Sequence, residues 1–585
     1  MKTIRYGYVL VVALMLILLI ACGKKDPNYE IRNDFDSASL LQLNENTSVD
    51  EITSNIGLIM KFKDHQITWK SDKSQAMIDG NIVIITRTLV DISVELEASI
   101  TVNGEKMTRK FTITIKKEDE NSMDLRKGTF DRLYPEYYEK GVPLIDDAHV
   151  IYINWDGFAK YYLDEFFATE EGKNSTLYKL KSEGVYFENL RNTFPSITNP
   201  CQNQILSGGT SLITGNIYRY YDKATDNVIQ QQRENKALIL PQVTVEEGLS
   251  TVSVRMYLAE PYLTSTDKNK LYVTEDSTNP KVIARGKSGD HFDRMEQAIK
   301  MIKGEPVLVG GQTFVFDEMP RLTIIYADDM DAVGHNENSH YGYPIAKTEA
   351  DRRKNIQTLL KEMDEKLGEL IEAAKARGIY ETLTFFLTTD HGMSPYGSRG
   401  VDDTMDYGIS KLYELIEDVS EYNKNYVLER VQPGYKPQKR TNIVGVCANL
   451  NMYMTFKNGV TDSELDNFKA YLETLPYVYE VYTRNDLINE YMDIKDVDIL
   501  VVPALHYSFS NTSPIFTISV RGQHDSSLPE SNCVPGFIWG KGIKVNYQYS
   551  EVAYNYDFGI TMAAVLGVDL PEANGIVLDI FERSE

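Results

Sequence analysis

Apolar, strand-like runs that alternate with helical patterns constrain the fold of this chain most strongly. From about Gly141 onward, such runs occur at His149–Asn154, Leu322–Ala327, Leu383–Thr389, Phe516–Val520 and Gly536–Gly540. Between them, apolar residues recur at helical spacing, most clearly across Lys347–Arg377. Strands that alternate with helices predict an α/β fold with a doubly wound, mostly parallel sheet.

Acidic residues and histidines follow the ends of these runs, each beside a glycine. They are Asp156, Asp331, His335, Asp390, His391 and His524. A single aspartate at a strand end is commonly a helix cap, and a single histidine is commonly structural. In a doubly wound sheet, however, the loops at the carboxyl ends of the strands meet along one edge. Carboxylates and imidazoles there suit zinc or manganese and can hold two ions, so we expect a site for two divalent metal ions.

The segment Asn192–Gln202 contains candidate nucleophiles. Pro200 fits the first turn of a helix, with Thr198 or Asn199 as its cap and Gly208-Gly209 at its end. A hydroxyl at a helix N-terminus lies beside free N–H groups that attract phosphate. This favours Thr198, with Ser196 and Cys201 as competing candidates.

The charge balance limits the partners. The 61 basic and 85 acidic residues give a net charge of −24, which argues against nucleic-acid binding through the phosphate backbone. The basic residues closest in sequence to the candidate ligands are Lys160 and Arg521. Positive charge for an anionic substrate is therefore expected from bound metal.

The N-terminus has the features of a secretion signal. Lys2 and Arg5 precede an apolar run, Tyr8–Ile20, which is shorter than the about 20 residues that span a membrane. Leu19-Ile20-Ala21-Cys22 looks like a bacterial lipobox. We expect a signal peptide over residues 1–21, lipidation of Cys22 as membrane anchor, and a location at the bacterial cell surface or the extracytoplasmic face of the membrane. An uncleaved anchor helix is the alternative.

A small β domain is expected next. Residues 22–36 are polar and are expected to form a tether, and residues 119–144 a linker. Between them, apolar residues alternate from Val94 to Val102 and from Phe111 to Ile115, on either side of Asn103-Gly104. This pattern predicts a hairpin with a two-residue turn. Residues 37–118 resemble the small immunoglobulin-like domains of bacterial surface proteins.

The motifs from about residue 145 resemble those of the type I phosphodiesterase/nucleotide pyrophosphatase family of the alkaline phosphatase superfamily. Phe194-Pro195-Ser196-Ile197-Thr198 matches the family's nucleophile signature. Asp156-Gly157, the span from Asp331 to His335, and Asp390-His391-Gly392-Met393 match its other motifs. The resemblance implies an alkaline-phosphatase-like domain over residues 145–585.

The resemblance also implies roles for individual residues. Thr198 would be the nucleophile and form a phospho-threonine intermediate, and Asn216 would hold a phosphate oxygen. One zinc would be held by Asp331, His335 and His524. The other would be held by Asp156, Asp390, His391 and the Thr198 oxygen. The implied activity is hydrolysis of phosphodiester or pyrophosphate bonds in a phosphate ester substrate.

Three positions depart from the family pattern and bear on the substrate. Members that cleave nucleotides carry an aromatic residue after the nucleophile, where this chain has Asn199. They continue with Pro-Asn-His, where this chain has Pro200-Cys201-Gln202. The sulfatase pattern is also missing, because it requires Cys or Ser in place of Thr198 and Arg in place of Gln202. Loss of base stacking, worth about 1–3 kcal/mol, weakens the expectation of a nucleotide substrate.

A smaller α/β cap is expected between the Asp390-His391 pair and His524, at about residues 394–515. Within it, Asn449–Phe456, Asp462–Leu472 and Val478–Tyr482 predict strand, helix and strand. Two alternatives to a diesterase stay open on the sequence. One is a phosphomonoesterase of the alkaline phosphatase kind, and the other is a non-catalytic surface binding lipoprotein.

Overall fold

The computed structural model describes residues 28–582 except positions 45, 73–75, 86–91, 117–137, 140, 275–290, 341, 397–409, 490–491 and 511–519. The chain forms two compact units, Met1–Glu118 and Asp119–Glu585, and each is described by itself. The expected signal peptide, Cys22, most of the linker and the strand expected at Phe516–Val520 (except Val520) lie outside the described residues.

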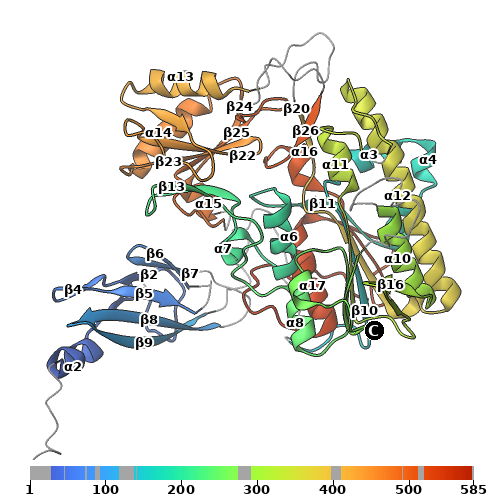
Figure 1. Cartoon of the computed structure of the whole chain (residues 1–585), viewed down its shortest axis with the longest axis horizontal. Coiled ribbons are helices and arrows are strands. Elements are labelled where there is room, and N and C mark those ends of the chain that lie inside the picture. The colour runs from blue at the N-terminus through green and yellow to red at the C-terminus, as the bar shows by residue number, and fades with distance from the viewer. Residues whose placement is uncertain are drawn as a thin grey trace, which may run out of the picture. The chain divides into compact units, whose positions relative to one another are not determined.

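The first unit is built from short strands around one core (Figure 1). Strands β8 (Ile92–Val102) and β9 (Glu105–Ile115) form the predicted hairpin, and Asn103 and Gly104 at its turn have φ of 52° and 80°. Such positive φ values are what a two-residue turn of this kind requires. The remaining strands are β1 (Leu41–Gln42), β2 (Ile56–Leu58), β3 (Lys61–Phe62), β4 (His65–Gln66), β5 (Thr68–Ser71), β6 (Ala76–Asp79) and β7 (Ile82–Ile85).

A helix replaces part of the expected tether. Helix α2 (Tyr29–Ser37) places Phe35 in the core of the first unit, where it is 0% exposed. The Arg109 guanidinium donates to the Phe35 carbonyl at 2.9 Å, which fixes the end of the helix on β9. The interpretation of residues 28–36 as a tether is therefore wrong. This segment forms a helix whose apolar side chain, Phe35, packs into the core of the first unit.

The second unit contains a nine-stranded sheet in the order β15-β14-β18-β10-β19-β28-β11-β27, with β29 paired to β11. Its strands are β10 (His149–Trp155), β11 (Gly184–Arg191), β14 (Thr251–Val254), β15 (Lys270–Val273), β18 (Leu322–Ala327), β19 (Leu383–Thr388), β27 (Cys533–Val534), β28 (Phe537–Gly540) and β29 (Tyr547–Tyr554). The neighbours from β15 to β19 pair in parallel, whereas β28 is antiparallel to β19 and β11. The predicted α/β fold with a mostly parallel sheet is thus confirmed.

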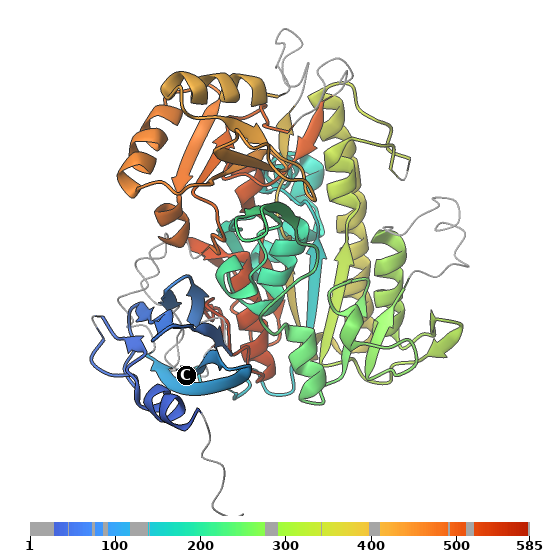
Figure 2. The same ribbon diagram turned by 60° about the vertical axis from the view of Figure 1, so that its left-hand side comes forward.

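Helices cover both faces of this sheet (Figures 1 and 2). Helices α10 (His291–Lys303) and α12 (Glu349–Arg377) pack on one face, and α6 (Thr198–Ser207) and α17 (Asn555–Leu566) on the other. The other elements of the second unit are α3 (Lys160–Ala168), α4 (Glu170–Lys173), α5 (Thr176–Glu183), α7 (Ser211–Thr214), β12 (Arg219–Asp222), β13 (Asn227–Gln230), α8 (Leu240–Glu246), η2 (Glu260–Tyr262), β16 (Val307–Val309), β17 (Gln312–Phe314), α11 (Asp329–His335), η3 (Tyr380–Thr382), β20 (Ser394–Tyr396), β26 (Arg521–Gln523) and α16 (Pro529–Asn532).

The segment predicted to form a cap contains a second sheet, which we call the cap sheet. It consists of β21 (Leu428–Arg430), β22 (Ile443–Ala448), β23 (Asn451–Phe456), β25 (Ile499–Pro503) and β24 (Val478–Thr483). Helices α13 (Leu412–Tyr422) and α14 (Asp462–Leu472) pack on one face, and α15 (Arg484–Asn489) follows β24. The other face packs on Ile197, Ile217 and Val228, which flank or follow the candidate nucleophile. The strand, helix and strand expected here are all present.

None of the helices among the described residues is both long and apolar enough to cross a membrane. Among the described residues, the apolar core of the first unit is separate from the apolar clusters of the second unit.

A buried arginine stabilises the turn of chain that carries His335. Arg352 is 0% exposed, and its guanidinium donates two hydrogen bonds to Glu349, at 2.7 and 2.8 Å. It also donates to the Tyr162 hydroxyl at 2.8 Å and to the Gly334 carbonyl at 3.0 Å. The carboxylate therefore neutralises a cation that in turn fixes the end of α11.

We predict that Glu349→Ala lowers the free energy of unfolding of the second unit by about 3–5 kcal/mol, because it leaves a buried guanidinium uncompensated. Thermal unfolding followed by circular dichroism measures the loss. Glu369→Ala is the matched control on the same helix, since its 2.6 Å pair with Lys366 is exposed on the glutamate side. That variant should cost less than about 1 kcal/mol. Equal losses in the two variants would contradict the prediction.

Candidate active site

The strand register brings the candidate ligands to one edge of the sheet. Trp155 at the end of β10 is level with Ala327 of β18, and Asn154 is level with Thr388 of β19. Asp156, α11 and Asp390 therefore start at the same height, as expected at the carboxyl ends of parallel strands. Gly157, with φ of 76°, allows the loops to meet, because a Cβ there would lie 2.7 Å from the Asp331 Cα.

Two groups of side chains in this edge could each hold a cation. Ligand atoms of Asp331, His391 and His524 lie within 4.8 Å of one another, and so do those of Asp156, Asp390 and His391. His335 Nε2 lies 3.2 Å from Asp331 Oδ1 and extends the first group. All six predicted ligands thus converge. The resemblance assigns His391 to one ion, whereas this geometry places it within reach of both groups.

The three histidines present the same ring nitrogen to the site. The Nδ1 atoms of His335, His391 and His524 lie 2.9, 2.9 and 2.8 Å from backbone carbonyl oxygens. A carbonyl oxygen only accepts, so each Nδ1 carries a proton and donates it. Nε2 is then the atom available to a cation, which is the arrangement typical of histidine ligands.

The carboxylates supply the clearest test of whether a cation fits here. Asp156 Oδ1 is buried and accepts no hydrogen bond from the described residues, whereas Asp331 Oδ1 has His335 Nε2 at 3.2 Å. Burial, together with the nearby Asp390 and Asp331 carboxylates, raises the pKa of Asp156 well above its ordinary value. Buried like charges of this kind are stabilised by a bound cation. The donor set therefore fits divalent metal.

Two of the histidines differ in charge. Burial opposes protonation of His335, but the neighbouring Asp331 raises its pKa to about 9. Burial and the nearby His391 lower the pKa of His524 well below the ordinary value. His524 is therefore neutral at pH 7, whereas a cation at His335 competes with a proton for Nε2.

Thr198 is the first residue of α6, and Ile197 occupies the cap position that the sequence assigned to Thr198 or Asn199. Its Oγ1 lies 3.1 Å from His391 Nε2, which places the hydroxyl beside both groups of ligands. Helix α6 ends at Gly208 in the left-handed conformation, as predicted. The hydroxyl therefore lies where free N–H groups and the candidate metal ligands meet.

The two competing nucleophiles lie elsewhere. Ser196 is 0% exposed, and its hydroxyl accepts a hydrogen bond from Asn192 Nδ2 at 2.9 Å. Burial raises the pKa of the Cys201 thiol well above its usual range, and its Sγ donates to the Pro195 carbonyl at 3.2 Å. Neither group is available as a nucleophile in this conformation.

Two polar side chains, Gln202 and Tyr326, orient the carboxylate ligands, and a third, Asn154, holds Gln202. Gln202 Nε2 donates to Asp390 Oδ2 at 3.1 Å and to Asn154 Oδ1 at 2.9 Å, and the Tyr326 hydroxyl donates to Asp156 Oδ2. Gln202 is one of the departures from the family pattern. The sequence could have indicated Asn154 and Tyr326 as residues of the site, because each is a polar residue next to the last position of an apolar strand.

No hydrogen bond among the described residues links Asn216 to the other predicted site residues. Asn216 is 0% exposed, and its Nδ2 donates to the carbonyls of Gln232 at 3.2 Å and Glu234 at 3.0 Å. Its Oδ1 accepts from the Tyr218 N–H at 3.0 Å. Both amide hydrogens are thus engaged, and the phosphate-binding role of Asn216 stays a prediction.

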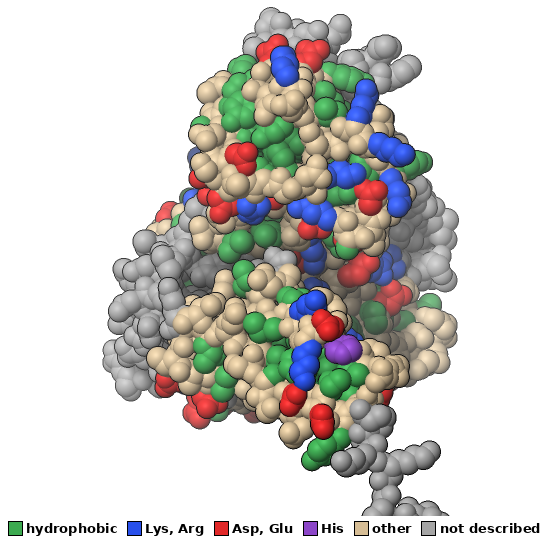
Figure 3. All heavy atoms as spheres, turned by 90° about the vertical axis from the view of Figure 1, so that its left-hand side faces the viewer, with side chains coloured by type: hydrophobic (Ala, Val, Ile, Leu, Met, Phe, Trp, Pro, Cys, Tyr) green, Lys and Arg blue, Asp and Glu red, His purple; other side chains and the backbone are tan. Residues whose placement is uncertain are grey.

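Neither basic residue singled out from the sequence neutralises the ligands. Lys160 pairs with Asp164, and Arg521 donates to the Asn336 carbonyl at 3.4 Å. On the face that Figure 3 shows, basic and acidic side chains are interspersed among neutral ones.

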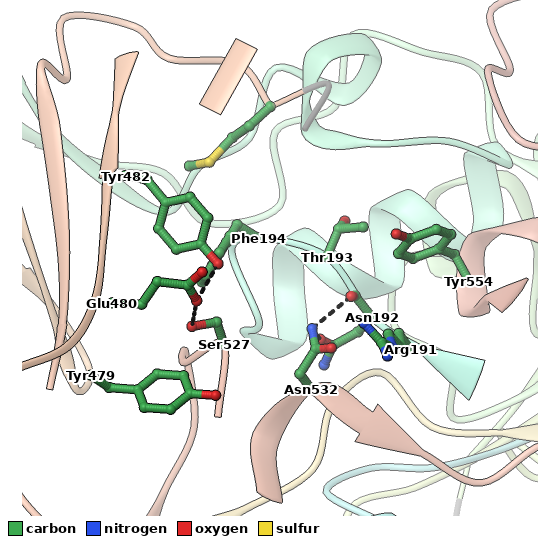
Figure 4. Close-up of a pocket in the computed structure, with 11 residues that line it drawn as sticks. Arg191, Asn192, Thr193, Phe194, Tyr479, Glu480, Tyr482, Ser527, Asn532 and Tyr554 are labelled. Carbon is green, nitrogen blue, oxygen red and sulfur yellow. Dashed lines mark hydrogen bonds between the residues drawn. The ribbon is translucent and has the colours of Figure 1, made fainter. Parts of the chain in front are cut away.

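A pocket of about 220 Å³ borders the segment that leads to Thr198 (Figure 4). Tyr479, Glu480 and Tyr482 of β24 line one side, and Arg191, Asn192 and Thr193 line the other. The Phe194 ring meets the Tyr482 ring edge-on, with centres 5.3 Å apart. The Glu480 carboxylate accepts hydrogen bonds from the Tyr482 hydroxyl at 2.5 Å and the Ser527 hydroxyl at 2.9 Å. Side chains of β24 therefore contact two segments next to the site: the one that precedes Thr198 and the one that follows His524.

Comparison with known proteins identifies both parts of the chain. The sequence model of the atrophied bacterial Ig domain matches residues 34–118. Bis(5'-adenosyl)-triphosphatase ENPP4 from Bos taurus is 32% identical over 84 residues, which are 14% of this chain and only 16% of that protein.

Similar solved structures include human ectonucleotide pyrophosphatase/phosphodiesterase 5, at 15% identity and a TM-score of 0.48, over 74% of this chain and 100% of that chain. The murine protein of the same name, as an inactive variant in complex with AMP, gives 14% identity, a TM-score of 0.48 and the same coverage.

The sequence model of type I phosphodiesterase/nucleotide pyrophosphatase matches residues 150–524, which is more than half of the chain. This match spans every candidate metal ligand from Asp156 to His524 and confirms the resemblance of the motifs. The chain therefore belongs to the type I phosphodiesterase/nucleotide pyrophosphatase family of hydrolases.

Proposed function

We propose that the protein hydrolyses phosphodiester or pyrophosphate bonds, with Thr198 as the nucleophile and two divalent metal ions as cofactors. The observation that carries this proposal is the position of Thr198 Oγ1, 3.1 Å from a histidine that two groups of ligands share. No other hydroxyl among the described residues combines a helix N-terminus with these groups.

The residues divide the work as follows. Thr198 attacks phosphorus, and a phospho-threonine forms as the alcohol or phosphate leaves on the opposite side. Water then hydrolyses this intermediate, and the Thr198 hydroxyl is restored. The N-terminal N–H groups of α6 favour the negative charge of the phosphoryl oxygens throughout.

Asp331, His335 and His524 would hold one cation, and Asp156, Asp390 and His391 the other. Bound there, two divalent ions lower the pKa of the attacking hydroxyl and stabilise the charge on attacking and leaving oxygens. The three carboxylates carry three negative charges, so two such ions leave one positive charge that an ionised Thr198 balances. Gln202 and Tyr326 keep Asp390 and Asp156 oriented toward the site.

Removing a ligand tests the metal assignment. We expect about two zinc or similar ions per chain by elemental analysis, and Asp331→Asn or His524→Ala should lose at least one of them. Turnover should fall by about a hundredfold or more in both variants. His149→Gln is the control, because His149 lies at the opposite end of β10 and contacts the Pro320 carbonyl at 3.1 Å. Full turnover after chelation would contradict the mechanism.

The charge of the preferred substrate follows from the surroundings of Thr198. A monoester brings an additional negative charge to the reacting phosphate, and among the described residues no hydrogen bond or ion pair links Lys160 or Arg521 to the candidate ligands. We predict that kcat/KM for bis(p-nitrophenyl) phosphate exceeds that for p-nitrophenyl phosphate by about tenfold, the effect of about 1.4 kcal/mol. Faster cleavage of the monoester would identify a phosphomonoesterase instead. Plain nucleotide diesters should hold no large advantage, since Asn199 offers no face to a base.

We infer that the protein acts outside the cytoplasm, attached to the membrane by a lipid on Cys22. The Leu19-Ile20-Ala21-Cys22 motif supports this location, and the lipid anchor of such proteins is stable when two or more chains are attached. Cys22→Ser should abolish radiolabelled palmitate incorporation and release the protein from the membrane fraction. The specific activity of the released protein should be unchanged. Unaltered membrane attachment of the variant would exclude the lipid anchor.

A further inference from the structure

One arginine that belongs to none of the motifs lies over an aromatic ring near the site. The Arg233 guanidinium carbon is 4.5 Å from the centre of the Tyr257 ring. The side chain is 57% exposed, and its only ion pair among the described residues is with Glu260, at 4.0 Å. An exposed pair at that distance contributes little, so the charge stays available to a ligand.

The backbone that carries Arg233 is fixed rather than free. Asn216 Nδ2 donates to the carbonyls of Gln232 and Glu234, the two neighbours of Arg233, and the Lys236 N–H donates to the Thr214 carbonyl at 2.9 Å. The buried amide of Asn216 thus holds this loop in place. A guanidinium presented on a fixed loop and stacked on a ring loses less entropy on binding than a free surface side chain.

Tyr257 connects this arginine to the nucleophile and to a metal ligand. Its hydroxyl donates to Asn199 Oδ1 at 2.7 Å, and Asn199 follows Thr198 directly. Its ring meets the Tyr326 ring edge-on at 5.6 Å, and the Tyr326 hydroxyl donates to Asp156. Arg233 is therefore separated from the reacting centre by one aromatic ring.

The contact with Tyr257 also orients Asn199. Because Oδ1 of Asn199 accepts from the phenol, Nδ2 remains as a donor, with no hydrogen bond to the described residues. A donor beside the nucleophile and a cation are thus linked through one residue, Tyr257. A phenylalanine at position 199 could supply neither the donor nor the acceptor for the Tyr257 hydroxyl.

We propose that Asn199, Tyr257 and Arg233 form a subsite for a second anionic group of the substrate. The substrate class is then a phosphodiester or pyrophosphate whose substituent carries a further phosphate or a similar anion. The nearby carboxylates, Glu260 and Glu234, are single and exposed or hydrogen-bonded to backbone, so the arginine is the group that an anion meets. This proposal rests on the proposed function, since it concerns the same site.

Binding measured without turnover tests the subsite. Isothermal titration calorimetry on the metal-loaded protein compares thymidine 5′-monophosphate with thymidine 3′,5′-bisphosphate, which differ by one phosphate. The wild type should bind the bisphosphate about five to ten times more tightly. Arg233→Gln should abolish this preference and leave the affinity for the monophosphate within about twofold, because the substitution removes only the outer contact.

A matched control removes the same charge elsewhere. Lys268 is 52% exposed and pairs with Asp317 at 4.0 Å, beside the amino-terminal end of β15 and so at the opposite edge of the sheet. Lys268→Gln should keep the preference for the bisphosphate. Equal affinities of the wild type for the two nucleotides, or a preference that survives in Arg233→Gln, would overturn the subsite.

The role of Asn216 supplies a second, independent variant. If it positions Arg233, Asn216→Ala should lose the preference for the bisphosphate while the affinity for the monophosphate persists. If it contacts the reacting phosphate, both affinities should fall together, and the positioning role is excluded. Hydrolysis of p-nitrophenyl diesters, measured on the same preparations, reports separately on the proposed function, so failure of turnover and failure of the subsite are distinguishable.

Discussion

Three carboxylates crowd one edge of a parallel sheet, and the rest of the site depends on how their repulsion is met. Asp156 and Asp390 follow adjacent strands in register, and Asp331 approaches so closely that position 157 accepts only glycine. The buried Oδ1 of Asp156 accepts no hydrogen bond from the described residues. Such a cluster of buried carboxylates is unfavourable unless cations neutralise its negative charge. The fold therefore forms a site that favours bound metal ions.

The surrounding scaffold holds this repulsive centre together. Backbone carbonyls fix the rings of three histidines, and a buried Arg352–Glu349 pair holds the end of α11 through the Gly334 carbonyl. The Gln202 side-chain amide donates a hydrogen bond to Asp390, and the Tyr326 hydroxyl donates one to Asp156. These hydrogen bonds keep the ligands in place even when no ion neutralises them. Substitution of the residues that make them is therefore expected to lower metal affinity, although none of them contacts the metal.

Substrate choice depends on what surrounds the nucleophile rather than on the shared motifs. The cap sheet packs on the chain that follows Thr198, and its β24 lines a pocket beside the segment that precedes it. Asn199 replaces the aromatic platform of nucleotide-cleaving members, yet Tyr257 approaches it from another part of the chain. The Tyr257 hydroxyl therefore orients the Asn199 amide beside the nucleophile, where an aromatic residue would present a ring.

The sequence by itself determined the local features. Apolar runs located β10, β18 and β19, the Asn103-Gly104 pair located a hairpin, and strand-end residues located all six candidate ligands, because each signal lies within a few residues of the structure it specifies. The antiparallel direction of β28, the helix that buries Phe35, and the partners of Asn216 were decided only by tertiary structure. Asn216 illustrates the reason. Its spacing from Thr198 fits a phosphate ligand, but its amide donates to the carbonyls of a loop whose position cannot be read from the sequence pattern. Long-range packing likewise brings Tyr257 to Asn199 and Arg233 to Tyr257. Side-chain neighbours across a fold are set by how its layers pack and not by their order along the chain.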